Sequence, residues 1–473
     1  MKSLSKGKTW LFAVGQFGWA LLSGLIGSWL VSFYLPSAES IAAGQKIFIP
    51  QGRVILGFLT VIGGVTALGR IFDAITDPLI ASLSDKCKSK SGRRIPFMKW
   101  AALPLAVTTV LVFCAPFDAD AKSGSLLNSL WVCLTVLAYY FLITMYCTPY
   151  TALYSEITHS EKERMLASSA ISLTFILGTG IGYLGPAVWG ALTPVFGDRV
   201  VAIRVTFAVF AVIALLCMYV PVFAIKEKDY VDTVPSQTTM MKSLGMTFRN
   251  KSFRVFVGSD IFYWLGLTMF QTGIPYFVTS LIGLPEAFQS MFLVLMTVLS
   301  LVFYPGINSV TSKVGKKKMV VAAFVMFTAV FAFTAFTGFG KNGNLVNTPF
   351  GAATAGQLVQ GLLMIVCGSL PMAIFGILPQ AMVADCAEYD QKLTGESRQG
   401  MFFAARTFCF KLGQALAMVL FTSLATVGSN GFGYRLAAMT AAVLCAIGGV
   451  ILLFYNEKKV LSNPTPEEIA AAR

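Results

Sequence analysis

The sequence predicts an all-α polytopic membrane protein with twelve transmembrane helices in two six-helix bundles that repeat each other. The first observation is composition: 56% of the 473 residues are hydrophobic and only 12% are charged, unlike a soluble domain of this size. The second is a succession of long apolar runs, and the third is an uneven distribution of lysine and arginine. A helix that crosses a bilayer needs about 20 residues, and the runs meet that length.

The apolar runs set the expected spans. An open chain satisfies its backbone polar groups in lipid only as helices, so each run is expected to form one. Lys2, Lys6 and Lys8 precede the first run, and no small-residue cleavage site follows a short apolar core. An uncleaved first helix is therefore expected rather than a signal peptide. The runs cover residues 10–35, 54–82, 97–115, 127–154, 166–192, 202–225, 254–282, 287–311, 319–339, 355–384, 401–427 and 433–455.

Lysine and arginine gather on one side of the expected spans. Most of the 36 lie near the two ends of the chain and in the even-numbered connections, which by the positive-inside rule places both termini in the cytoplasm. The formal net charge of +14 is then explained by topology in a cytoplasmic (inner) membrane. The expected partners are the lipid bilayer and a small-molecule substrate, and no nucleic acid. The odd-numbered connections hold Lys46, Arg53, Lys122, Arg199, Arg204, Lys341 and Arg435.

The two halves of the chain echo each other. A long connection at residues 226–253 reads as a cytoplasmic linker between a first bundle at 1–225 and a second at 254–473, which ends in a short cytoplasmic tail. A glycine followed by basic residues comes after span two and again after span eight, and acidic residues follow spans four and ten. Two repeats of the same sense suit a transporter with a central site. The candidates for a cytoplasmic gate are Asp85, Arg93, Arg94, Glu156, Asp385 and Glu388.

Two acids lie inside span two. Asp73 and Asp77 are four residues apart, so they share one face of a helix, and Arg70 lies on the same stripe. A charged and unpaired side chain at the bilayer centre costs at least about 2.5–3.5 kcal/mol. One interpretation is a local Arg–Asp pair that only orients the helix. The other is a buried cation site whose charge changes during a transport cycle.

A lysine in span eleven lies at a matching depth. At about 1.5 Å per residue, Asp77 and Asp73 are about 12 and 18 Å from the cytoplasmic end of span two, and Lys411 is about 16 Å from Gly400. A lysine at that depth needs a carboxylate or a water-filled cavity. Asp73 and Asp77 are its expected partners, either in a structural ion pair or with Lys411 as a replaceable counter-ion.

Polar side chains form stripes on spans one, four, seven and eleven, each on roughly one helix face. Hydroxyl, amide and aromatic groups around a cavity suit a sugar, because its hydroxyls need hydrogen-bond partners and its C–H surface packs on a ring. Each stripe taken alone is also explained by contacts between helices. The candidate substrate-binding residues are Gln16, Trp19, Tyr140, Thr151, Trp264, Gln271, Arg406 and Thr407.

Arg406 must be paired, because an isolated buried charge is costly. Asp260 on span seven lies at a similar depth and would make an internal pair. The alternative partner is a substrate carboxylate, which a guanidinium group grips in bidentate fashion. The first alternative predicts an uncharged substrate and the second an acidic sugar.

Signals for metal binding or catalysis are weak. The nine cysteines show no CxxC spacing, and the single histidine, His159, lies in a polar loop. No cofactor is expected, and no metal beyond sodium as a coupling ion. A membrane-embedded enzyme would need a nucleophile–base pair or a metal cluster, and a channel would need a continuous polar pore.

The whole chain resembles a known family. The first signature is residues 70–78 with 84–85 and 92–94, and the second runs through residues 384–395 and 400–414. With this order and spacing, the sequence is identified as a member of the glycoside–pentoside–hexuronide:cation symporters, the melibiose-permease-like family of the major facilitator superfamily. The resemblance implies the major facilitator fold and symport of a sugar, glycoside or uronide with H⁺ or Na⁺ by alternating access. A monomer is expected, and a lysolipid or other amphiphile carrier of the same superfamily is the alternative.

The resemblance also implies roles for individual residues. Asp73 and Asp77 match the family's cation-site carboxylates, Thr144 its cation-site threonine and Lys411 its lysine on helix eleven. The acid expected one turn after Thr144 is Cys147, which weakens sodium coordination and favours protons. A galactoside is not expected, because the positions that would bind it fall at about Ala20, Ile171 or Ser172, Thr151 and Gly376.

Overall fold

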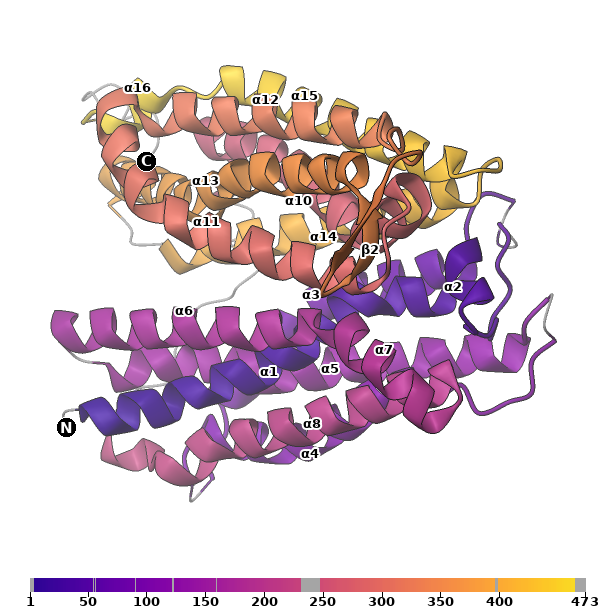
Figure 1. The fold of residues 1–473 in the computed structure, drawn as a ribbon. Coiled ribbons are helices and arrows are strands. Elements are labelled where there is room, and N and C mark those ends of the chain that lie inside the picture. Colours follow the sequence, from indigo (N-terminus) through magenta and orange to yellow (C-terminus); the bar gives the residue numbers. More distant parts are fainter. Residues whose placement is uncertain are drawn as a thin grey trace. The chain divides into compact units, whose positions relative to one another are not determined.

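The computed structural model describes residues 4–463 except 54, 56, 90, 121–122, 159, 231–246 and 396–398 (Figure 1). Regular structure in this part of the chain is helical apart from one two-stranded hairpin, β1 (Leu345–Thr348) with β2 (Gly351–Thr354). The hairpin lies in the expected loop between spans nine and ten and was not predicted. Twelve of the described helices have 18 residues or more, which confirms the predicted all-α architecture.

The first six long helices follow the predicted spans with one interruption. Span five is broken at Leu184, where Pro186 stands in the first turn of the next helix and cannot donate a backbone hydrogen bond to the preceding one. The segments are α1 (Lys6–Tyr34), α2 (Ala38–Ala42), α3 (Val61–Asp85), α4 (Ile95–Val112), α5 (Leu126–Ile157), α6 (Glu161–Tyr183), α7 (Gly185–Phe196), α8 (Arg199–Ala224) and the 3₁₀ turn η1 (Glu227–Asp229).

The second six long helices also follow the spans, although the tenth extends about ten residues beyond its predicted end. Thr354 and Gln357 form a reciprocal capping box at the start of that helix. The segments are α10 (Lys251–Tyr276) with the π-helical turn η2 (Phe277–Ile282), α11 (Ala287–Val314), α12 (Lys316–Ala335), α13 (Ala355–Thr394), α14 (Gln399–Ala425), α15 (Phe432–Leu453) and α16 (Glu457–Leu461).

Eleven helices within the described residues are long and apolar enough to cross a membrane. The twelfth, α3, is long enough at 25 residues. It differs because any 18-residue stretch of it includes Arg70, Asp73 and Asp77. The chain is therefore a multi-pass membrane protein, and α3 is the one predicted span that three charged residues set apart.

The chain forms two compact units. The first comprises residues 1–236, 285–294 and 349–351, and the second residues 237–284, 295–348 and 352–473. The predicted linker at 226–253 begins with η1, but its residues 231–246 lie outside the described part of the chain.

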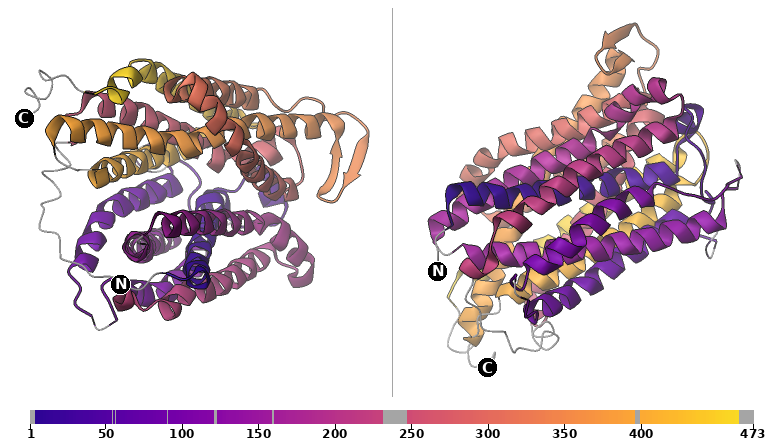
Figure 2. Two further views of the ribbon diagram at one scale, coloured as in Figure 1. Left: turned by 90° about the vertical axis from the view of Figure 1, so that its left-hand side faces the viewer. Right: turned by 90° about the horizontal axis from the view of Figure 1, so that it is seen from below.

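Four helix pairs recur in the two units. In the first, α1 packs against α6 and α8, and α4 packs against α5 and α8. In the second, α10 packs against α14 and α15, and α12 packs against α13 and α15. The long helices of each unit run side by side (Figure 2). The internal repeat that the sequence predicted is therefore a repeat of helix packing.

Glycine allows the helices around α1 to approach closely. A Cβ on Gly18 would lie 2.5 Å from the carbonyl oxygen of Ala214 in α8. A Cβ on Gly178 in α6 would lie 2.4 Å from the carbonyl oxygen of Phe17. Small residues of this kind let helix backbones meet in a membrane protein.

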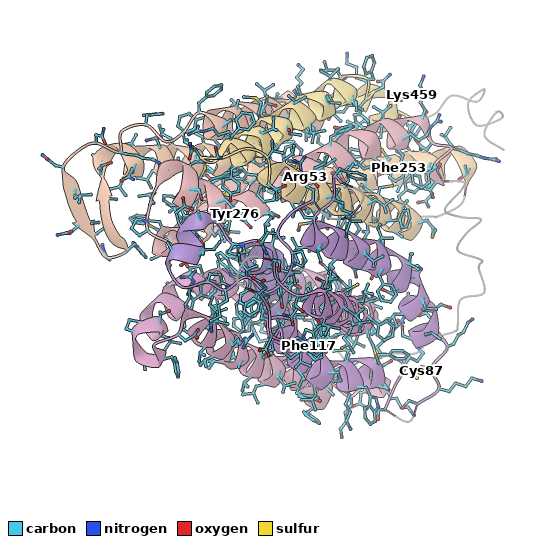
Figure 3. All side chains as sticks on the ribbon, turned by 90° about the vertical axis from the view of Figure 1, so that its right-hand side faces the viewer. Arg53, Cys87, Phe117, Phe253, Tyr276 and Lys459 are labelled. Carbon is cyan, nitrogen blue, oxygen red and sulfur yellow. The ribbon has the colours of Figure 1, made fainter. Side chains whose placement is uncertain are left out.

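In the second unit the matching helix is α10, which is mostly buried beyond its first turn. Phe253 in its first turn and Tyr276 at its end are both almost fully buried (Figure 3). The first helix of each repeat is thus the inner element around which its neighbours pack.

Candidate functional site

The two acids of α3 face two threonines of α5. Thr144 Oγ1 donates a hydrogen bond to Asp73 Oδ1 over 2.6 Å, and both side chains are buried. One turn further along both helices, Thr148 Oγ1 donates to Asp77 Oδ1 over 3.3 Å. Asp77 is half-buried. The four-residue spacing of the acids is therefore matched by the four-residue spacing of the threonines, and the two acid–threonine contacts form a row of hard oxygen ligands between the helices.

Arg70 extends the same row. Its guanidinium carbon lies 5.2 Å from the centroid of the Tyr140 ring, within the range of a cation–π contact. The two helices can come this close because Gly69 has no Cβ. A Cβ there would lie 2.5 Å from the Tyr140 ring. Nε of Arg70 is buried and makes no hydrogen bond. Arg70 is thus positioned by an aromatic face next to the acids.

The second unit contains a buried ion pair between α10 and α14. Arg406 donates from Nε to Asp260 Oδ2 over 2.7 Å and from Nη2 to Asp260 Oδ1 over 3.1 Å. Both side chains are about 4% exposed. Of the two partners considered for Arg406, the structure provides the internal one, Asp260. The guanidinium group binds both oxygens of its carboxylate.

Aromatic candidates for the substrate site lie in both units. Trp264 in α10 stacks on Phe410 in α14, with ring centroids 4.7 Å apart. Trp19 in α1 packs against Phe175 in α6 at 5.7 Å. Trp19 and Trp264 stand at the same distance from the first residues of their helices, and the indole N–H of each is buried without a hydrogen-bond partner. The repeat therefore places one indole donor in corresponding positions of the two units.

The remaining candidates differ in burial. Gln16 and Tyr140 are buried, Gln271, Thr407 and Lys411 are half-buried, and Thr151 is exposed. The pairing of Lys411 in the second unit with the acids of α3 in the first stays a prediction. Among the described residues, no three His, Cys, Asp or Glu side chains gather as a metal site.

Four of the six gate candidates form one cluster at the predicted cytoplasmic end of the first unit. Arg94 is buried and donates to Asp85, to Ser84 Oγ over 2.5 Å and to Glu156 Oε1 over 2.8 Å. Arg93 Nη2 donates to the same glutamate oxygen over 3.2 Å. These contacts tie the end of α3, the start of α4 and the end of α5 together.

The second unit has a simpler version of this cluster. Lys316, the first residue of α12, donates from Nζ to Asp385 in α13 over 2.5 Å. Glu388 does not take part: its side chain is 61% exposed and pairs locally with Lys392 at 2.9 Å. Lys316 was not among the candidates, although it follows a glycine as Arg93 does.

Two glutamates that sequence reasoning missed cap helices in these clusters. Glu227, in η1 after α8, accepts hydrogen bonds from the backbone N–H groups of Arg93, Arg94 and Ile95 over 2.7, 2.9 and 3.0 Å. Glu457, in α16 after α15, accepts from those of Lys316 and Lys317 over 2.7 and 3.3 Å. A carboxylate at a helix N-terminus satisfies free N–H groups and the helix dipole. The signal was the Glu-Lys pair that follows the last long helix of each half.

The Glu227 cap depends on a glycine. Gly92 has φ +116°, and a Cβ there would lie 2.2 Å from Glu227 Oε2. Gly315 has φ +96°, and a Cβ there would lie 3.0 Å from Glu457 Oε2. Both the positive φ and the absent Cβ favour glycine here, which explains why a glycine precedes the basic residues in both halves.

Glu227→Gln is expected to destabilise the protein by about 1–3 kcal/mol, because a buried charge-assisted cap with three donors becomes a neutral one. Thermal unfolding of the purified protein would measure this as a lower Tm. Glu388→Gln is the matched control, since its exposed ion pair is worth about 0–1 kcal/mol. Equal melting temperatures for the two variants would contradict the role given to Glu227.

Within the described residues, twelve long helices, with four helix pairs repeated in the two units and charged residues among apolar ones, define a polytopic membrane transporter. Residues 11–456 match the family described as MFS/sugar transport protein. The chain belongs to this family. The match agrees with the resemblance to glycoside–pentoside–hexuronide symporters and with the major facilitator fold.

The chain is also similar to several symporters and transporters. It is 26% identical to the inner membrane symporter YicJ of Escherichia coli, over 87% of this chain and 85% of that protein. It is 24% identical to the isoprimeverose transporter of Lactiplantibacillus pentosus, over 85% and 81%. It is 23% identical to the sodium-dependent lysophosphatidylcholine symporter 1-A of Danio rerio, over 90% and 77%. These relatives confirm a transporter rather than an enzyme.

A solved structure shares the fold. The crystal structure of the nucleoside transporter NupG matches with a TM-score of 0.63 at 14% sequence identity, covering 94% of this chain and 98% of that chain. At that identity the likeness concerns the fold alone.

Proposed function

We propose that this transporter couples the uptake of an uncharged sugar or glycoside to the entry of a cation, with Asp73 and Asp77 as the coupling acids. The observation that carries this proposal is the row of two acids and two threonines between α3 and α5. A carboxylate within a membrane-spanning bundle marks an ion or proton pathway more often than it serves packing. Thr144 and Thr148 on α5 hold carboxylate oxygens of Asp73 and Asp77 on α3 by hydrogen bonds. A cation bound between the two helices can replace or join these hydroxyl contacts.

Protons are proposed to couple at least as well as sodium. Sodium needs several hard oxygen ligands, and the row supplies two carboxylates and two hydroxyls, with the soft thiol of Cys147 where a further acid would help. A proton needs only one carboxylate in a poorly solvated site. Lys411 is proposed as the counter-ion that the incoming cation replaces.

The proposed substrate is uncharged because Arg406 already has an acid partner. Asp260 takes the Nε and one Nη2 N–H group and balances the charge of the guanidinium group, which weakens its attraction for the carboxylate of a uronate. The indole N–H groups of Trp19 and Trp264, with the amides of Gln16 and Gln271, would serve the hydroxyls of a sugar. The isoprimeverose transporter among the relatives favours a glycoside of this kind.

Uptake into proteoliposomes is the test, with a panel of neutral sugars, glycosides and uronates. Uptake of a neutral glycoside is expected to respond to an inward proton gradient without sodium. A strict sodium requirement with no response to pH would overturn proton coupling. Uptake of uronates alone would overturn the uncharged substrate.

A lysolipid carrier is the second candidate, favoured by the similarity to the lysophosphatidylcholine symporter. The same proteoliposomes distinguish the two. Uptake of labelled lysophosphatidylcholine, together with no uptake from the sugar panel, would favour the lipid substrate. Uptake of neutral glycosides, with none of lysophosphatidylcholine, would favour the sugar.

A further inference from the structure

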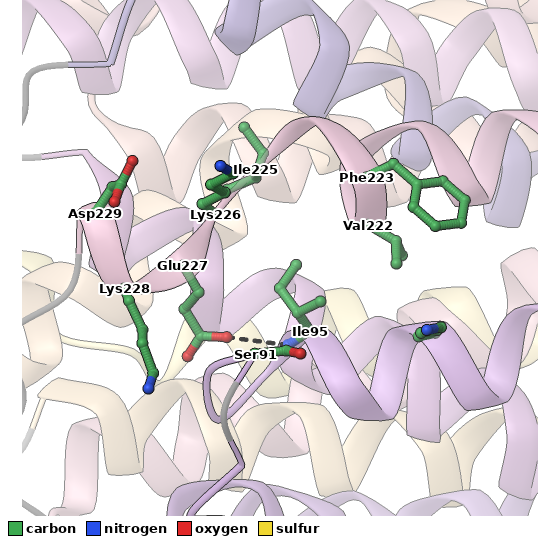
Figure 4. A pocket seen from close by; sticks show the side chains of 10 residues that line it. Ser91, Ile95, Val222, Phe223, Ile225, Lys226, Glu227, Lys228 and Asp229 are labelled. Carbon is green, nitrogen blue, oxygen red and sulfur yellow. Dashed lines mark hydrogen bonds between the residues drawn. The ribbon is translucent and has the colours of Figure 1, made fainter.

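A cavity outside the transport site opens where the N-terminus of α4 meets the C-terminus of α8 (Figure 4). Its volume is about 370 Å³. One part of the lining is apolar and comes from Ile95, Val222, Phe223 and Ile225. The other part is charged and comes from α4 and from the segment that follows α8. A pocket with an apolar part and a charged part fits an amphiphilic ligand.

The accessible charge of the pocket is positive. Lys99, Lys226 and Lys228 line it, and all three are exposed. Glu227 also lines it, but its carboxylate is 2% exposed and is held by three backbone N–H groups at the start of α4. Asp229 is the remaining acid, half-buried. The lining therefore holds three exposed lysines and, besides the capping Glu227, one acid, and this excess of positive charge favours an anion.

Aromatic side chains beside the lysines place the pocket at the level of lipid headgroups. Trp100, next to Lys99, is 74% exposed. The Tyr219 hydroxyl donates to the Lys99 carbonyl over 3.3 Å, and its ring stacks on Phe223 at 5.6 Å. Tryptophan and tyrosine gather at the interface between membrane and water, where lysines extend their charge toward the headgroups.

Apolar side chains lead from the pocket along both helices. On α4 and α8 they recur at helical spacing and are exposed, as expected for surfaces that face acyl chains. They are Leu103, Val107 and Leu111 on α4 and Val209, Val212 and Leu216 on α8.

We propose that this pocket binds the phosphate headgroup of an anionic phospholipid. Lys99, Lys226 and Lys228 hold the phosphate, and the acyl chains follow the exposed faces of α4 and α8. Juxtamembrane lysines attract anionic lipids by about 1 kcal/mol each, which is about a fivefold change in affinity. The proposal depends on the membrane location of the chain and not on the transported substrate.

The test is native mass spectrometry of the purified full-length protein, titrated with dioleoyl phosphatidylglycerol, dioleoyl phosphatidylcholine or inorganic phosphate. The pocket variant combines Lys99→Gln, Lys226→Gln and Lys228→Gln. The matched control combines Lys6→Gln, Lys86→Gln and Lys88→Gln, which removes the same charge from exposed positions outside the pocket.

Phosphatidylglycerol is expected to bind the natural protein more tightly than phosphatidylcholine, and the pocket variant is expected to lose at least about fivefold in affinity, the contribution of one lysine. The control should keep its affinity. Equal losses in both variants would overturn the site, because general surface charge would then explain binding. Displacement of the lipid by inorganic phosphate at equal concentration would also overturn it and would indicate a site for free phosphate.

Phe223→Ala provides a second measurement that leaves the charge unchanged. It is expected to weaken retention of phosphatidylglycerol, because the acyl chains lose an apolar surface that is 72% exposed in the protein. Val325→Ala, at an exposed position of α12, is the control. Unchanged retention in both variants would contradict the path given to the acyl chains.

Discussion

Asp73→Asn is expected to abolish concentrative uptake, reducing it to the level of protein-free liposomes. The amide oxygen can still accept the 2.6 Å hydrogen bond from Thr144, so the helix contact survives while the negative charge is lost. The neutral amide of asparagine neither takes up a proton at physiological pH nor carries a charge that attracts a metal cation. Asp77→Asn is expected to have the same effect, since the two acids face α5 side by side.

Accumulation of the labelled substrate against its gradient, at matched protein incorporation, is the measurement. Asp118→Asn, at an exposed loop position, is the control and should accumulate substrate normally. Full accumulation by either α3 variant would show that its acid does not couple transport. Facilitated equilibration without accumulation would instead support the proposal, since only the coupling would have been lost.

Arg406→Gln is expected to destabilise the protein by about 3–5 kcal/mol, because it leaves Asp260 as an uncompensated buried charge. Asp260→Asn should cost a similar amount by stranding the guanidinium group. The double variant should recover part of the loss, because no charge then remains buried alone. Thermal unfolding in detergent measures each step.

The exposed pair of Lys46 and Asp198 is the matched control. Lys46 Nζ lies 2.8 Å from Asp198 Oδ2, and the two side chains are 61% and 34% exposed. The hydrogen bond from Lys46 lowers the pKa of the Asp198 carboxyl. Lys46→Gln should change stability by no more than about 1 kcal/mol. If Arg406→Gln were equally mild yet lost substrate, Arg406 would belong to the substrate site rather than to an internal pair.

Some of the candidate site could be predicted within single helices. Asp73 and Asp77 stand out because a polar group inside an apolar run is costly, and their spacing alone places them on one face. Thr148 was missed because nothing in α5 distinguishes it from other hydroxyl residues of that helix. Only its position opposite Asp77, 71 residues away in the chain, makes it a partner.

The cluster at the helix ends also shows that the sequence identifies charged candidates but not their partners. The repeated glycine and basic residues identified Arg93 and Arg94 as candidates, the acidic residues that follow spans four and ten identified Glu156, and these three do meet. Glu388 belonged to the same pattern but points to a local lysine, and Glu227 lay outside it although it binds three backbone groups of α4. A charged pattern identifies which residues need partners, whereas packing selects the partners.

The sequence by itself determined the class of this protein and the number of its long helices. Apolar runs of sufficient length can satisfy their backbone in lipid only as helices, and the charges between them repeat in two halves. The tertiary structure decided which residues face each other: Arg406 with Asp260, 146 residues apart, and Glu227 with the start of α4. These contacts depend on the rotation and register of one helix against another, which side-chain packing sets and which the periodicity of a single helix does not contain.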